Sequence, residues 1–128
     1  MQTKDPHGFR FRDWQIYQDA RQFRKDTNLL VKRFPGEEKY ALSDQTRRAL
    51  ISVILNIAES TNKNSDKEMK VYINRSHCSL DEVVACMDCA VDEGYINKEE
   101  LEMVLSKAES LTKQLTAFTV YLSKSKKS

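Results

Sequence analysis

Apolar side chains recur every three or four residues along most of this chain, which is the period of an α-helix with one buried face. Four such stretches are present, and we expect helices at about 13–34, 43–61, 65–93 and 97–123. The links between them are short, so consecutive helices should run antiparallel. The pattern therefore predicts an all-α fold, an antiparallel up-down-up-down four-helix bundle.

Three of these stretches carry a stripe of apolar or small residues that should form the core along the bundle axis. The expected stripes are Ile16, Ala20, Phe23, Thr27, Leu30 and Phe34 in the first helix, Met69, Tyr72, Ser76, Leu80, Val83, Met87 and Ala90 in the third, and Leu101, Val104, Ala108, Leu111, Leu115, Phe118 and Leu122 in the fourth.

The second stretch differs, because ALISVILNIAES at 49–60 is apolar on almost every side. Successive residues lie about 100° apart around a helix, so its large side chains lie on several faces. The neighbouring helices of a four-helix bundle would not cover all of these faces. Two interpretations remain open. This is the central helix of an uneven bundle, or its second face is covered by another copy of the chain. The pattern favours self-association.

Residues that commonly begin and end helices mark the boundaries. The expected N-caps are Asp13, Ser43, Ser65 and Asn97, with Glu68 and Glu100 three positions after the last two, and the expected stops are Phe34-Pro35-Gly36 and Gly94. Three glycines and two prolines are too few for the many turns of a sheet protein. We expect a flexible N-terminal segment at 1–12, one bundle domain at 13–123 and a basic tail at 124–128.

Composition is that of a soluble globular protein, with 40% hydrophobic and 31% charged residues. No apolar run approaches the roughly 20 residues that cross a bilayer, and the N-terminus lacks the apolar stretch of a secretory signal. Cys78, Cys86 and Cys89 are then expected as reduced thiols. We predict a cytoplasmic protein that has no membrane partner.

Sequence signals for catalysis and for metal binding are weak. Cys86 and Cys89 share a helix face but lack the second pair of ligands that a zinc site needs, and His77 lies on a different face. No glycine-rich phosphate loop, Ser-His-Asp set or His-Glu-x-x-His helix is present. We expect no metal, no cofactor and no catalytic residue, and we expect the two cysteines to pack as small hydrophobic side chains.

A series of short motifs runs along the chain. It comprises FRDWQIYQDA, RFPGEEKYAL, then Gln45, Arg47, Arg48, Ala49 and Ser52, then NIAES, Ser65-x-Lys67-Glu68, Tyr72, Ser79-Leu80-x-Glu82 and the GYI at 94–96. From about Phe11 to Leu122, without a gap, the chain resembles the bacterial four-helix bundle proteins encoded in intervening sequences of large-subunit ribosomal RNA genes. NIAE followed by Ser-x-x-Glu at this separation is the specific part of the resemblance.

This resemblance implies a ring-like homopentamer of four-helix bundles without known catalytic activity. A related branch is similar to the accessory variability determinant of diversity-generating retroelements, a basic pentameric bundle that associates with a reverse transcriptase and binds nucleic acid. The chain departs from the family pattern at Ser60, where a glycine is usual, and at Lys63, where an arginine is common. It also departs at Arg75-Ser76-His77-Cys78, where the family segment is usually apolar residue, Ala, any residue, Gly.

Polar residues follow one face of the second helix, at spacings of three and four. A hairpin that turns near Lys63 would place this face opposite the third helix. The expected polar seam consists of Arg48, Ser52, Asn56, Glu59, Ser79 and Glu82, with Arg48 paired to Glu82 and Asn56 donating to a backbone group or to Ser79. Its expected role is structural, to fix register and subunit orientation. The alternative for Glu59 is a solvated residue at a helix end.

Charge is unevenly distributed, although the net charge is only +2. Residues 81–109 carry nine acidic and two basic residues, and the rest of the chain carries 19 basic and ten acidic residues. In an up-down bundle the N-terminal end of the first helix lies beside the hairpin near Lys63. We call this end the basic pole, and it gathers Arg10, Arg12, Lys63, Lys67, Lys70, Lys124, Lys126 and Lys127, against Asp13, Glu59, Asp66 and Glu68. The opposite end, the acidic pole, gathers Asp88, Asp92, Glu93, Glu99, Glu100 and Glu102.

The leading hypothesis is a non-enzymatic oligomeric bundle, pentameric by resemblance, whose repeated basic pole binds RNA or DNA phosphates without base specificity. No aromatic residue is interleaved with these lysines, so stacking on single strands is not expected. The alternative is an interaction protein with a protein partner, for example a reverse transcriptase. A small enzyme that uses the polar seam is a third hypothesis. A solvated charge pattern that only keeps the bundle soluble would explain the same residues.

Overall fold

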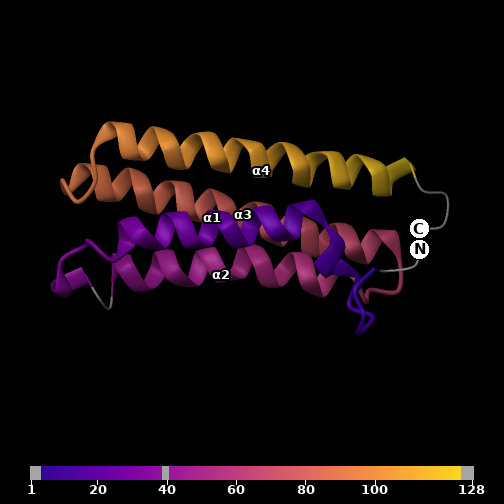
Figure 1. Ribbon diagram of the computed structural model, residues 1–128. Coiled ribbons are helices and arrows are strands. Elements are labelled where there is room, and N and C mark those ends of the chain that lie inside the picture. Colours follow the sequence, from indigo (N-terminus) through magenta and orange to yellow (C-terminus); the bar gives the residue numbers. More distant parts are fainter. Residues whose placement is uncertain (1–3, 39–40, 125–128) are drawn as a thin grey trace.

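The computed structural model describes residues 4–38 and 41–124 of the chain, with side chains as far as Leu122. Every regular element in this part is helical. The elements are η1 (Arg10–Asp13), α1 (Gln15–Val31), η2 (Gly36–Glu38), α2 (Leu42–Ser60), α3 (Asp66–Asp92) and α4 (Lys98–Lys124). Helices α1 to α4 run alternately in opposite directions along one axis (Figure 1). The four-helix bundle that the periodicity predicts is confirmed.

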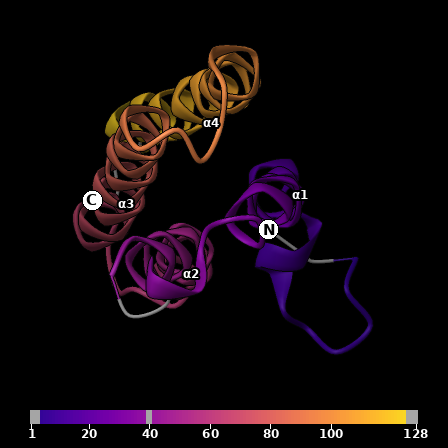
Figure 2. The ribbon, with the colours of Figure 1, turned by 90° about the vertical axis from the view of Figure 1, so that its left-hand side faces the viewer.

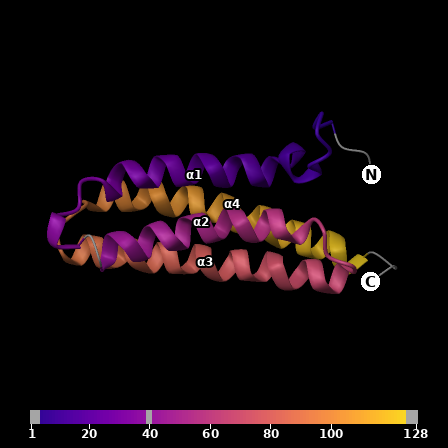
Figure 3. The ribbon, with the colours of Figure 1, turned by 90° about the horizontal axis from the view of Figure 1, so that it is seen from below.

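Each long helix lies beside its neighbours in the sequence, and α4 also packs against α1 (Figure 2). The link between α2 and α3 covers only residues 61–65, so these two helices form a tight antiparallel hairpin. Because the number of long helices is even, the start of α1 and the end of α4 lie at the same end of the bundle (Figure 3).

The core follows the expected stripes with a few exchanges. Val31 is buried, at 1% exposure, in place of Leu30, and Leu101 and Phe118 pack only partly buried against the core. In α3, Ile73 is 0% exposed and Tyr72 is only half-buried. The buried stripe of α3 is therefore Met69, Ile73, Ser76, Leu80, Val83, Met87 and Ala90. The expectation for Tyr72 is wrong, because a regular four-three repeat turns residue 73 inward and residue 72 toward the flank.

Two of the expected helix starts are wrong. Asp13 belongs to η1, where its carboxylate accepts the backbone N–H of Lys4 at 2.7 Å, and the N-cap of α1 is Trp14. Helix α2 begins one residue earlier than expected, at Leu42, and Ser43 is buried inside its first turn. Asp13 thus bonds a different backbone group and Ser43 is buried, so neither side chain caps its helix.

Ser65 and Asn97 cap α3 and α4 as expected, but the Glu68 carboxylate accepts the backbone N–H of Asn64 where a capping box would have that of Ser65. Ser65 Oγ accepts the backbone N–H of Glu68 at 3.2 Å. Asn97 and Glu100 exchange two bonds, of 3.0 and 2.8 Å, in a reciprocal capping box. Gly94 follows the end of α3 with a φ of +76°, a conformation that glycine adopts without strain.

Most of the apolar surface of α2 is buried within a single chain. Leu50, Val53 and Ile57 are at most 1% exposed, while Leu55 remains outside at 51% exposure. Helix α2 reaches this burial because it packs against α1, α3, η1 and η2. The interpretation as the central helix of an uneven bundle is thus sufficient. Burial within one chain does not test whether copies of the chain associate, so self-association stays a prediction.

We expect Leu50→Ala to lower the free energy of unfolding by about 2–5 kcal/mol, because it opens a cavity in the core. Leu55→Ala on the same helix should cost less than about 1 kcal/mol, because Leu55 is already 51% exposed. Urea denaturation followed by circular dichroism measures both values. Equal losses in the two variants would contradict this orientation of α2.

Two ion pairs join α4 to Asp26 of α1 and to Arg33, just beyond the end of α1, and each lowers the pKa of its carboxylate. Glu100 forms an ion pair with Arg33 and accepts the backbone N–H of Asn97, and these contacts, the Arg33 contact first, hold the pKa of Glu100 below its ordinary value of 4.5. The Lys107 ammonium, 2.9 Å from Asp26, likewise lowers the pKa of Asp26. A depressed folded pKa stabilises the native state above the unfolded pKa, and this contribution is lost as the pH falls through the folded value.

Acid should therefore weaken the bundle as the pH falls below 4.5, the ordinary pKa of a glutamate. In Glu100→Gln the melting temperature should fall less steeply between about pH 5 and about pH 2, because one carboxylate of depressed pKa is absent. Arg33→Gln is the matched variant and should flatten the same curve, since it removes the cation that causes the shift. Thermal melts across this range test both, and slopes identical to wild type would exclude the pair as a source of acid sensitivity.

Candidate nucleic-acid interface

The basic pole is built from four elements that lie at one end of the bundle (Figures 1 and 3). Arg10 and Arg12 lie in η1, Lys63 in the α2–α3 link, Lys67 and Lys70 at the start of α3, and Lys124 at the end of α4. The side chain of Lys124, and all of Lys126 and Lys127, lie outside the described residues. The up-down topology thus brings the described members of the basic pole to one end.

Two of these cations hold the N-terminal segment in place. Arg10 Nη2 donates to the carbonyl oxygen of Thr61, just beyond α2, at 3.0 Å. Arg12 Nη1 pairs with the carboxylate of Asp5 at 2.7 Å. An ion pair cancels much of the field that either charge exerts at a distance. Arg12 therefore contributes less positive potential to the basic pole than the sequence implies.

Other cations gather around an aromatic ring. Lys63 Nζ lies 4.1 Å from the centroid of the Tyr72 ring, and Arg75 Cζ lies 4.5 Å from it. Both distances are cation–π contacts. The expectation that no aromatic residue is interleaved with the basic residues is wrong. The three-residue spacing of Tyr72 and Arg75 puts both on one face of α3 and could have indicated the cluster, but assigning Tyr72 to the core conceals it.

A hollow of about 460 Å³ opens beside this ring at the α2–α3 link. Its lining consists of Asn62, Lys63, Asn64, Glu68, Val71 and Tyr72. The Glu68 carboxylate accepts the backbone N–H of Asn64 at 3.0 Å, and this bond holds the link against the start of α3. The hollow is thus polar, with a cation and an aromatic ring on its wall.

The acidic pole lies at the opposite end, where α3 ends at Asp92 and α4 begins at Lys98. Cations are present there as well, but two of them are paired: Arg33 with Glu100 and Arg48 with Asp44. Each pair cancels the field of one acid as well as of one cation, so these contacts leave the net charge of the acidic pole unchanged.

The polar seam lies between α2 and α3. Ser52 Oγ and Ser79 Oγ are 2.8 Å apart, and Asn56 Nδ2 donates to the carbonyl and hydroxyl oxygens of Ser52, at 2.9 and 3.0 Å. Ser76 Oγ, at 0% exposure, donates to the carbonyl oxygen of Val53 at 2.7 Å across the same interface. These bonds offset the cost of taking the hydroxyl groups out of water.

The expected ion pair between Arg48 and Glu82 is wrong. Arg48 Nε pairs with Asp44 at 3.0 Å, one turn earlier in α2, and Glu82 accepts a hydrogen bond from Gln45 Nε2. The Arg48 side chain is 75% exposed, and a local i,i+4 pair needs no ordering of this long side chain across two helices. Glu59 is exposed, which agrees with the alternative of a solvated residue at a helix end.

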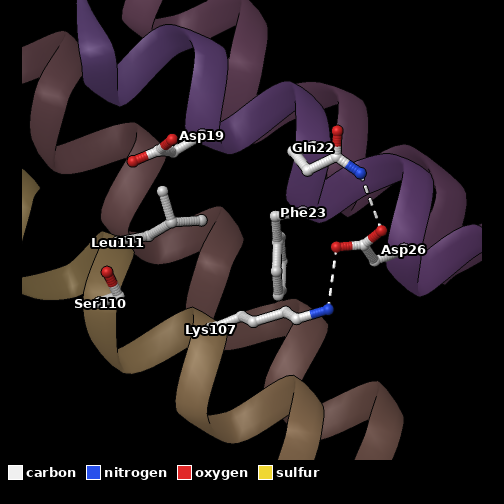
Figure 4. A pocket seen from close by; sticks show the side chains of 7 residues that line it. All are labelled: Asp19, Gln22, Phe23, Asp26, Lys107, Ser110 and Leu111. Atoms are coloured by element: carbon white, nitrogen blue, oxygen red, sulfur yellow. Dashed lines mark hydrogen bonds and ion pairs between the residues drawn. The ribbon is translucent and has the colours of Figure 1, made fainter.

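The groove between α1 and α4 is another concave site (Figure 4). It has a volume of about 190 Å³ and is lined by Asp19, Gln22, Phe23, Asp26, Lys107, Ser110 and Leu111. Lys107 Nζ and Gln22 Nε2 each bond the Asp26 carboxylate at 2.9 Å. The lowered pKa of Asp26 makes this carboxylate a poor proton acceptor. The polar contacts in this groove therefore connect α1 to α4.

The three thiols are free. Cys86 is buried as expected, whereas Cys89 is exposed, so its expected packing in the core is wrong. Burial raises the pKa of the Cys86 thiol, which is the opposite of what activates a cysteine. In the described part of the chain, no group of three or more His, Cys, Asp or Glu residues could hold a metal ion. No described helix combines the length and apolarity of a membrane span.

We expect Arg48→Ala and Glu82→Ala to be additive in unfolding free energy within about 0.5 kcal/mol, because the two side chains have different partners. Ser52→Ala and Ser79→Ala should instead be coupled by about 0.5–1.5 kcal/mol, because their hydroxyls share a hydrogen bond. Two double-mutant cycles by chemical denaturation measure both terms. Coupling in the first cycle, or additivity in the second, would contradict the contacts described.

Most of the chain matches a known protein family. The profile of the family described as 23S rRNA-intervening sequence protein matches residues 12–117, which span α1 to α3 and most of α4. The matched segment contains the whole polar seam and Tyr72, and it leaves out Arg10 and the lysines from 124 onward. No curated protein matches the chain. The chain belongs to the 23S rRNA-intervening sequence protein family.

Proposed function

We propose that this protein is a non-enzymatic, self-associating helical bundle whose basic pole binds the phosphate backbone of RNA or DNA without base specificity. The observation that carries the proposal is the uneven charge along the bundle axis. One end has eight basic residues against Asp13, Glu59, Asp66 and Glu68, and the other end has the six residues of the acidic pole. Clustered lysine and arginine side chains bind phosphates by releasing condensed counterions, and this binding needs no base contact.

Self-association would strengthen the field at the basic pole. One chain has a net charge of only +2, but copies with their basic poles on the same side would add their potentials. Large apolar side chains outside the core offer surface for such contacts. Phe9, Leu29, Val71, Met103, Val120 and Tyr121 are 46–64% exposed. We propose a homopentamer, the state that the family resemblance implies.

The polar seam has a structural role in this proposal. Its hydroxyl and amide groups bond one another and the helix backbone, and Ser52 and Ser79 connect α2 to α3. A hydrogen bond that forms in one register and is lost in a shifted one favours the native alignment. This arrangement supports register fixing and offers no activated nucleophile.

Nucleic-acid binding should be strong at low salt and weak at high salt. We expect a labelled RNA hairpin and a DNA duplex of equal length to bind with similar affinities at about 50 mM salt. Both should lose at least tenfold by about 200 mM, because several phosphate contacts release counterions. Lys67→Gln combined with Lys70→Gln should make the salt slope less steep by about 1.8 per chain, whereas Lys98→Gln at the opposite end should not. Fluorescence anisotropy measures all of these values.

Two outcomes would contradict the proposal. Absence of binding at low salt would remove the nucleic-acid function, and a folded species of 14.9 kDa in sedimentation at micromolar concentration would remove self-association. In the first case the alternative is an accessory role for a protein partner, for example a reverse transcriptase. The exposed Leu29 and Met103, which line a second α1–α4 groove of about 180 Å³, are the surface to substitute in that case.

A further inference from the structure

We infer that Lys63, Tyr72 and Arg75 form a phosphodiester-binding subsite of the basic pole, in which the tyrosine ring holds two cations in place for adjacent phosphates of a nucleic acid. The inference rests on the proposed function and names its main contact. Lys63 comes from the α2–α3 link and Arg75 from the third turn of α3, yet both cations lie within 4.5 Å of one ring centroid.

A cation–π contact positions a charge without cancelling it. The ring attracts Lys63 and Arg75 through its quadrupole but carries no net charge, so both cations keep their full field. Arg12, by contrast, is paired with the carboxylate of Asp5 at 2.7 Å. Lys63 and Arg75 therefore share one aromatic ring, and neither is in a salt bridge among the contacts described.

Fixing the cations before binding favours affinity. Long basic side chains lose rotamer freedom when they bind a phosphate, and contacts already made in the free protein reduce that loss. Tyr72 is a suitable support because α3 is anchored directly beside it by Ile73, which is 0% exposed. The ring is half-buried with two cations over it, so it is engaged and does not offer an open platform for a base. The subsite fits phosphate in preference to a base.

The hollow beside Tyr72 leads to a second prediction, which concerns Glu68. Of its lining residues, Glu68 is the acid, and its carboxylate is held by the backbone N–H of Asn64. A phosphate bound at Lys63 would be repelled by this charge. Glu68→Gln keeps an oxygen acceptor for Asn64 and removes the charge, so it should tighten binding.

The test is anisotropy of a labelled RNA hairpin with the full chain at salt concentrations between about 50 and 200 mM. Lys63→Gln and Arg75→Gln should each weaken binding roughly three- to tenfold at low salt and make the salt slope less steep by about 0.9 per chain. Tyr72→Leu should weaken binding roughly two- to fivefold with the slope unchanged, because the charges remain but are no longer held. Tyr72→Phe keeps the ring and should bind like wild type.

Lys98→Gln is the matched control, since it removes one exposed cation at the acidic pole. Thermal melts verify that each variant is folded. Wild-type affinity and slope in Lys63→Gln and Arg75→Gln, with loss in Lys67→Gln combined with Lys70→Gln, would overturn the subsite and leave the proposed function standing. Wild-type affinity in Tyr72→Leu would overturn the positioning role of the ring. Failure of the wild-type chain to bind at low salt would overturn both proposals.

Discussion

The packing of α2 against α3 is the contact on which the rest of the molecule depends. Ile57 and Ile73 are completely buried, and the Ser76 hydroxyl is bonded to the carbonyl oxygen of Val53 across the interface. The apolar contacts supply most of the stabilisation, and the hydrogen bonds favour one register over its neighbours. This register, together with a link of only five residues at 61–65, decides that Lys63 meets the ring of Tyr72.

The α1–α4 side is held differently. Polar bridges cross it at several levels: Gln114 to Asp19 at 3.0 Å, Lys107 to Asp26 at 2.9 Å, and Arg33 to Glu100. Open grooves of about 190 and 180 Å³ lie along the same α1–α4 interface. Partly exposed ion pairs contribute little stability each, so the α1–α4 interface should open more readily than the α2–α3 interface. The bundle thus combines a firmly packed hairpin with a more weakly joined pair of helices.

The sequence predicts the fold well because apolar period, short links and capping boxes all indicate the same topology. It fails at finer scale for identifiable reasons. Tyr72 and Ile73 both fit a three-or-four spacing, and a difference of 100° in helix angle decides which one is buried. Arg48 has acids within reach on two helices, and its exposed side chain adopts the local partner, Asp44. Asp13 cannot be recognised as part of η1 without knowing where the preceding backbone turns.

The candidate site shows the same division between what is local and what is not. Grouping the lysines at one end needs only the helix order, which the sequence supplies. The cluster of Lys63, Tyr72 and Arg75 needs the register of α3 and the path of the link, both of which depend on tertiary packing. Side-chain partners across elements are decided by distances of an ångström or two, and helical periodicity does not resolve these.

An even number of antiparallel helices returns the chain to the end where it started, so the start of α1 and the end of α4 flank the basic pole. A fusion attached just before α1 or just after α4 would therefore start from the same end of the bundle as Lys63 and the cluster around Tyr72, and an acidic tag there would alter the local potential. The turn at Gly94, at the other extremity, is where a label can be inserted without crowding this surface.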